Sequence, residues 1–282
     1  MKVYLTTDLE GVAGVNGRGE AVGNKILNNE AACELLLKEV NATVEGLVRG
    51  GADEIVVLDC HGGGNNIDIR GLHKAASFRA VAYGPVSFMS SSFSAMVRIG
   101  CHAMEGNERG HLNHTMSSGG IANIWLNDSL IGETGMLVLQ ASYFGVPVIL
   151  ISGDTEACKE GLEFIGGEIE TVETKKSISR YSTIDRNPVK VREELTEKAE
   201  KAVRNIAKYP IKKVSGPYEL KVQYMGPNAA LQMEMLGAER LDFQTVVFRS
   251  NDYIDCYAQF CGWAPGVHNR KYGISPRKGI LD

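Results

Sequence analysis

The sequence has no apolar run long enough to cross a membrane. Its longest such run lies near residues 146–151, far short of the roughly 20 residues that a spanning helix needs. The amino terminus leads directly into a strand pattern, without the charged and then apolar segments of a secretory signal. A formal net charge of -4 with no dominant basic patch argues against nucleic acid as a partner. We therefore expect a cytoplasmic protein that binds neither membranes nor nucleic acids.

Cysteine and phosphate-binding motifs are also missing. The 6 cysteines are scattered, with no C-x-x-C pair of the kind that structural zinc sites use, so they are most simply free thiols. The pairs Cys60-His61 and Cys101-His102 suggest a Cys2His2 site or a cysteine nucleophile. However, adjacent side chains in extended backbone point to opposite faces, which disfavours both readings. The run Gly62-Gly63-Gly64 lacks the following Gly-Lys-Ser/Thr of a P-loop.

The first part of the chain alternates strand and helix patterns. At 282 residues and 44% hydrophobic, the chain can form one large domain or two smaller ones. Because strands alternate with amphipathic helices, we expect an α/β fold with a largely parallel sheet, spanning residues 1–180. The predicted strands cover residues 3–5, 54–58, 79–83, 95–100, 121–126 and 146–151, and the predicted helices cover 28–49, 132–144 and 154–164.

The second part differs in character. A heavily charged helix is expected from Pro188 to about Lys208. Proline is favoured at the first position of a helix, which is where Pro188 would lie. Strands at 220–225 and 243–248 flank a helix at 228–236, and a last helix is expected at 252–261. We interpret residues 181–282 as a smaller α+β domain that contributes to assembly.

Acidic and imidazole side chains gather where predicted strands end. Asp8 and Glu10 follow the first strand and lie two residues apart, so their carboxylates project from one face and repel unless a cation or proton lies between them. Further candidates at strand ends and in polar loops are His61, His102, His111, His114 and Glu133. Each alone has a structural explanation; Glu133, for example, suits the first turn of a helix. Together, acids and histidines favour zinc or manganese over magnesium, with Asp8 as a natural bridge between two ions.

With these residues in place, the chain resembles the D-aminopeptidase family, peptidase family M55, over about residues 1–180. The resemblance implies two zinc ions per subunit and a catalytic His114. It also implies that Asp8 bridges the ions, that Glu10 and His61 complete one site, and that His102 and Glu133 complete the other. A homo-oligomer, in known members a decamer, is implied too. The motifs, in chain order, are Asp8-Leu9-Glu10-Gly11, Asp59-Cys60-His61, Gly100-Cys101-His102-Ala103, Asn113-His114-Thr115-Met116, Asn127-Asp128, Gly132-Glu133-Thr134-Gly135, Val146-Pro147-Val148 and Ser152-Gly153-Asp154.

The resulting hypothesis is a dinuclear zinc aminopeptidase. Metal-activated water would remove the N-terminal residue of short peptides. The resemblance implies that these are peptides of D-amino acids. Two alternatives stay open at this point. One is a metal-dependent amidohydrolase or phosphatase acting on a non-peptide substrate, and the other is a metal-binding oligomer without catalytic activity.

Overall fold

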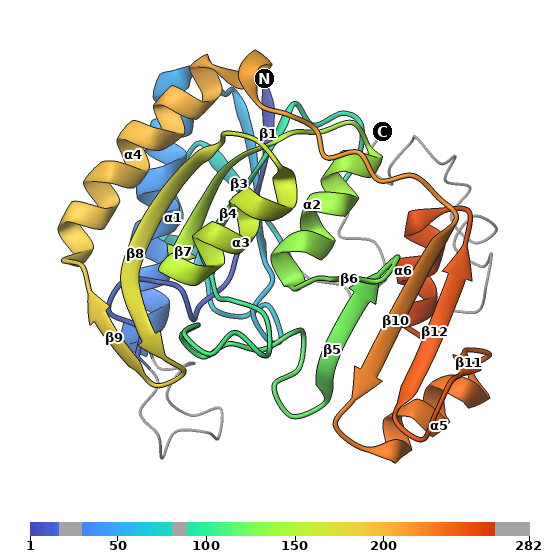
Figure 1. The fold of residues 1–282 in the computed structure, drawn as a ribbon. Helices are drawn as coiled ribbons and strands as arrows, with labels where there is room; N and C mark the ends of the chain where they lie inside the picture. Colours follow the sequence, from blue (N-terminus) through green and yellow to red (C-terminus); the bar gives the residue numbers. More distant parts are fainter. Residues whose placement is uncertain (17–29, 81–88, 263–282) are drawn as a thin grey trace.

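A seven-stranded sheet forms the larger part of the protein (Figure 1). The computed structural model describes residues 1–16, 30–80 and 89–262. Neighbouring strands of this sheet are parallel, apart from the antiparallel pair at the β9 edge. In spatial order the strands are β3 (Ala76–Arg79), β2 (Glu54–Asp59), β1 (Lys2–Thr7), β4 (Ala95–Cys101), β7 (Val148–Asp154), β8 (Glu170–Ser179) and β9 (Ser182–Asp185).

Helices cover both faces of the large sheet, and the alternation of side chains along β1 shows why. Val3 and Leu5 pack in a cluster with α1 (Glu30–Gly50) and α4 (Pro188–Arg204), whereas Tyr4 belongs to the cluster on the opposite face. That face carries α2 (Glu133–Tyr143) and α3 (Thr155–Ile165). A strand buried on both faces reads as a nearly continuous apolar run, which matches the full burial of β7.

A second, antiparallel sheet stands beside the α2 face (Figure 1). The β5–β6 hairpin turns at Asn127 and Asp128, whose φ angles of 47° and 65° are the positive pair of a type I′ turn. Short 3₁₀ turns lie at Ile69–Gly71 and Ile206–Lys208. The strands in order are β11 (Glu239–Arg240), β12 (Thr245–Ser250), β10 (Tyr218–Tyr224), β5 (Ile121–Leu126) and β6 (Ser129–Leu130), with helices α5 (Pro227–Met235) and α6 (Tyr253–Phe260).

The predicted fold class is confirmed, with a mostly parallel sheet flanked by helices. The strand expected at 79–83 lies earlier, at Ala76–Arg79; Ala80 is outside the strand, and residues 81–83 fall outside the described residues. Strand β8 was not expected, and β5 joins the second sheet rather than the parallel one. The division at residue 180 stays a prediction. The two sheets do not correspond to two successive parts of the chain, because β5 of the second sheet precedes β7 of the large sheet. Helix α4, from beyond residue 180, packs on α1.

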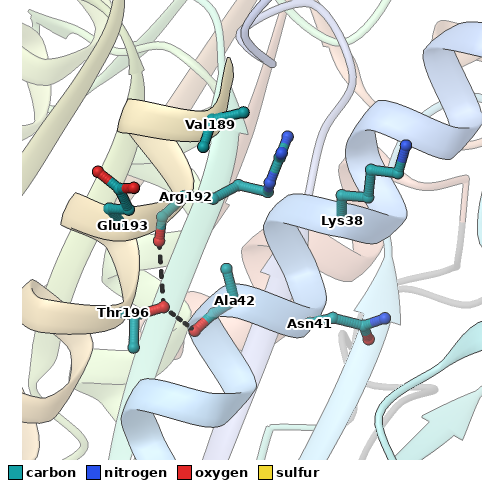
Figure 2. Close-up of a pocket in the computed structure, with 7 residues that line it drawn as sticks. All are labelled: Lys38, Asn41, Ala42, Val189, Arg192, Glu193 and Thr196. Carbon is teal, nitrogen blue, oxygen red and sulfur yellow. Dashed lines mark hydrogen bonds between the residues drawn. The ribbon is translucent and has the colours of Figure 1, made fainter. Parts of the chain in front are cut away.

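Helices α1 and α4 lie unusually close together. A Cβ at Gly46 would lie 2.2 Å from the Thr196 carbonyl oxygen, so this contact requires glycine. The Thr196 hydroxyl also bonds the carbonyl oxygen of Ala42 across the helix pair (Figure 2). A groove of about 360 Å³ beside this contact contains none of the predicted site residues. None of the helices in the described ranges has the length and apolar content to cross a membrane.

Candidate metal centre

The predicted site residues converge at one edge of the large sheet. Strands β1, β2 and β4 are parallel neighbours, so the residues after their carboxyl ends meet there, where open α/β sheets bind ligands. Asp8, His61 and His102 follow these three strands directly or closely. Glu133 is the first residue of α2, and His114 comes from the irregular segment between β4 and β5.

His102 lies between two carboxylates. Its Nε2 atom is 3.5 Å from Asp8 Oδ2 and 3.4 Å from Glu133 Oε1. His102 Nδ1 lies 2.9 Å from the carbonyl oxygen of Ala103, which can only accept a hydrogen bond. Nδ1 therefore carries a proton, and Nε2 is the ring atom that can bind a metal once it has lost its own proton. Consistent with this, Nε2 is buried and has no hydrogen-bond partner within the described part of the chain.

A second group of ligand atoms adjoins the first. Atoms of Glu10, His102 and His114 all lie within 4.8 Å of one another, as do those of Asp8, His102 and Glu133. The His102 and His114 rings are stacked, with centroids 3.9 Å apart. His114 is oriented like His102, since its Nδ1 lies 2.8 Å from the Leu112 carbonyl oxygen and its Nε2 faces Glu133 Oε1 at 3.7 Å.

His61 reaches the centre through Glu10, with its Nε2 atom 3.3 Å from Glu10 Oε1. The structure thus brings together all six residues predicted as ligands or catalytic group, although His61 belongs to neither three-residue group. His111 belongs to neither group; it is buried, and its backbone N–H donates to Asp154 Oδ2. The division of the six residues between two ions stays a prediction.

Crowding of the acids shifts their protonation. Burial and the neighbouring Glu10 carboxylate raise the pKa of Asp8 to about 8, although His102 and Arg98 act to lower it. Burial also acts to raise the pKa of Glu10, but His61 and His102 outweigh it and hold that pKa well below its usual value. Burial opposes ionisation of Glu133 as well, yet His102 lowers its pKa to about 2.

The histidines differ among themselves. Burial acts to lower the pKa of His61, but the hydrogen bond and charge of Glu10 raise it to about 9. Burial also acts to lower the pKa of His102, but Glu133 and Asp8 raise it well above its usual value. Burial and the charge of His102 lower the pKa of His114. Protons thus balance the charge of the acids, and a divalent cation bound here would displace them.

Arg98 also lies in the centre, and our sequence analysis missed it. Its side chain projects from β4 and is 2% exposed, with Nη2 3.0 Å from Asp8 Oδ2 and 3.6 Å from Glu133 Oε2. A charged residue inside the apolar strand pattern at 95–100 is the signal that could have identified it, because such residues are rarely buried without a partner.

The turn after β1 is fixed from β4 and β8. A Cβ at Gly11 would lie 2.0 Å from the Cys101 carbonyl oxygen, and one at Gly100, where φ is +73°, would lie 2.1 Å from the Asp8 carbonyl oxygen. From β8, the buried Lys175 ammonium donates to the carbonyl oxygens of Glu10 and Val15. The backbone that carries two predicted ligands is therefore held from both sides.

Comparison with known proteins gives concordant results. The profile of a family described as D-aminopeptidase matches residues 1–261. A curated D-aminopeptidase from Bacillus subtilis strain 168 is 28% identical over 264 residues, covering 91% of this chain and 94% of the relative. Among solved structures, a protein described as the zinc-dependent D-aminopeptidase DppA from Bacillus subtilis, a self-compartmentalizing protease, aligns with a TM-score of 0.84. That alignment has 26% identity and covers 92% of this chain and 95% of DppA.

Proposed function

The chain belongs to the D-aminopeptidase family, and from this membership we propose that it is a dinuclear zinc aminopeptidase that removes N-terminal D-residues from short peptides. The observation that carries the proposal is the buried Nε2 of His102, which has no hydrogen-bond partner in the described residues and faces the carboxylates of Asp8 and Glu133. Mixed imidazole and carboxylate ligands of this kind suit zinc.

We assign the roles of the ligands as the family resemblance implies. We assign Asp8 to bridge the ions, because it adjoins both groups: it faces His102 directly and precedes Glu10 by two residues. Glu10 and His61 would complete one site, and His102 and Glu133 the other. Zinc, when bound, lowers the pKa of a water molecule toward ~7 and thereby supplies hydroxide at neutral pH.

His114 is the remaining group for proton transfer. The Leu112 carbonyl oxygen fixes its ring through Nδ1, and Nε2 faces the centre, 3.7 Å from Glu133 Oε1. Burial and the neighbouring His102 favour the neutral ring, which can accept a proton from attacking water and later return it to the leaving amine. We therefore assign His114 as the general base and acid.

The test is a hydrolysis assay with the zinc-loaded protein. D-alanine and L-alanine p-nitroanilides should both be offered, and we expect turnover of the D substrate at least about tenfold faster in kcat/KM, equivalent to about 1.4 kcal/mol of transition-state discrimination. Equal rates would refute the D preference alone. If neither is hydrolysed by protein carrying two zinc ions, the aminopeptidase function is wrong. Cleavage of an aryl phosphate or a non-peptide amide would then favour a different hydrolase.

We also propose that the protein forms a homo-oligomer, with ten subunits as the resemblance implies. Apolar side chains are exposed around α5 and the β11–β12 loop, with Met235 79% and Phe243 65% exposed. Large exposed apolar residues grouped in this way mark protein contacts. The self-compartmentalizing description of DppA supports a second copy of the chain as the partner.

Charge introduced on this face should reduce the size of the assembly. We expect Phe243→Asp to give a smaller species than the wild type in light scattering. The control, Ile69→Asp, changes an equally exposed side chain (62%) on the large-sheet side and should leave the mass unchanged. A monomeric wild type would contradict the proposal.

A further inference from the structure

Arg98 places a permanent positive charge inside the candidate centre. Its guanidinium is deeply buried, and such a group stays protonated in proteins. Nη2 is in ion-pair range of Asp8 and Glu133, so these two acids have a cationic neighbour before any metal binds. The mechanism proposed above assigns Arg98 no role.

The guanidinium and an ion in the Asp8–His102–Glu133 group would share a ligand oxygen. Asp8 Oδ2 lies 3.0 Å from Arg98 Nη2 and 3.5 Å from His102 Nε2. Glu133 instead presents Oε2 to Arg98 and Oε1 to His102. A cation bound between these ligand atoms would therefore lie within a few ångströms of the guanidinium, and like charges repel strongly where water is excluded.

Contacts with neighbouring residues fix the position of the Arg98 side chain. Its Nε donates to the Thr134 hydroxyl at 3.2 Å, on the helix turn that carries Glu133. The thiols of the partly buried Cys60 and the buried Cys101 lie near the guanidinium. Nη1 is buried without a hydrogen-bond partner in the described residues. The ion pairs and hydrogen bonds found for Arg98 involve Asp8, Glu133 and Thr134, and none involves Glu10, His61 or His114.

We propose that Arg98 is a positioning residue that makes the two metal sites unequal. In the metal-free protein it holds the Asp8 and Glu133 side chains in place. By its charge it weakens the affinity for the ion bound by Asp8, His102 and Glu133, and the ion on the Glu10 side binds more tightly. This inference rests on the proposed function, since it takes zinc as the ligand of the centre.

Zinc titration of the full chain tests the proposal. Protein freed of metal by a chelator is titrated with zinc alone in a calorimeter, as wild type and as Arg98→Met, which keeps an unbranched side chain but removes the charge. We expect two wild-type binding steps whose affinities differ at least tenfold. In Arg98→Met the weaker step should tighten at least tenfold, with the stronger step unchanged. Arg98→Lys, which keeps the charge, should leave the weaker step weak.

Thermal unfolding gives a second readout. Metal-free Arg98→Met should unfold at a lower temperature than the metal-free wild type, because Asp8 and Glu133 lose their cation. The difference should shrink when zinc is bound, since the metal replaces the missing charge. A merely structural arginine would lower both unfolding temperatures equally. As a matched control, Arg180→Met removes a partly exposed arginine paired with Glu105 and should change neither zinc step.

The outcomes distinguish a failure of this inference from a failure of the proposed function. A weaker step that is unchanged or loosened in Arg98→Met overturns the inference, as do equal wild-type affinities or equal losses of unfolding temperature. A wild type that binds no zinc overturns the proposed function instead. If Arg98→Met fails to fold, Arg98→Gln takes its place, because its amide can still donate to Asp8 without a charge. The same tightening is expected, and its absence overturns the inference.

Discussion

Asp8→Asn should release both zinc ions and reduce kcat/KM by about a thousandfold or more, because without the ions no hydroxide is generated at neutral pH. Asp8 is buried in contact with His102 and Arg98. The neutral amide of asparagine has a single oxygen and no charge, so it cannot serve two cations as a carboxylate can. Metal analysis after gel filtration, together with the assay on D-alanine p-nitroanilide, measures both effects.

Glu10→Gln is the matched comparison for Asp8→Asn. It removes a negative charge from the same turn, two residues after Asp8. By our assignment, however, Glu10 binds only one ion. We expect one zinc ion per subunit to remain. Retention of one ion by Asp8→Asn would refute the bridging role, and circular dichroism of both variants shows whether the fold is kept.

His114→Gln should lower kcat by about a hundredfold to ten-thousandfold, the range that a positioned acid–base group contributes. KM and zinc content should stay as in the wild type, because the substitution removes proton transfer while the ligands on both sides remain. Steady-state kinetics with metal analysis measures this separation.

His111→Gln is the control for His114→Gln, because His111 lies in the same segment but in neither group of ligand atoms. We expect its kcat to stay within a few-fold of the wild type. If His114→Gln loses an ion instead, His114 is a ligand, as its place in the group with Glu10 and His102 allows.

The sequence patterns that predicted the fold correctly depend on local physics. The run at 146–151 is apolar because β7 is buried on both faces. The helix expected at 154–164 is present, and Asp154 caps it by accepting from the Ala157 N–H. Strand β8 was missed because it carries buried polar residues. Thr174 and Lys175 face inward to bond the turn after β1, so the strand lacks the alternation of a typical one.

The site was predictable as a set of residues and less so as an arrangement. Parallel strand ends converge by the geometry of the sheet, which is why Asp8, His61 and His102 could be grouped from sequence. Arg98 could not be placed in the same way. A charged residue in a strand pattern shows that a partner is needed, but only the packing of α2 on β4 shows that the partners are Asp8 and Glu133.

Two glycines, Gly11 after β1 and Gly100 in β4, have a consequence for how this centre can change. Gly11 lies against the Cys101 carbonyl and Gly100 against that of Asp8, so the two backbone segments are in direct contact. This contact sets the separation of Glu10 from His102. Substitutions of side chains around the site leave this contact in place, and with it the spacing of the two predicted ligands. A single methyl group at either glycine would clash with the opposing carbonyl oxygen and alter that spacing.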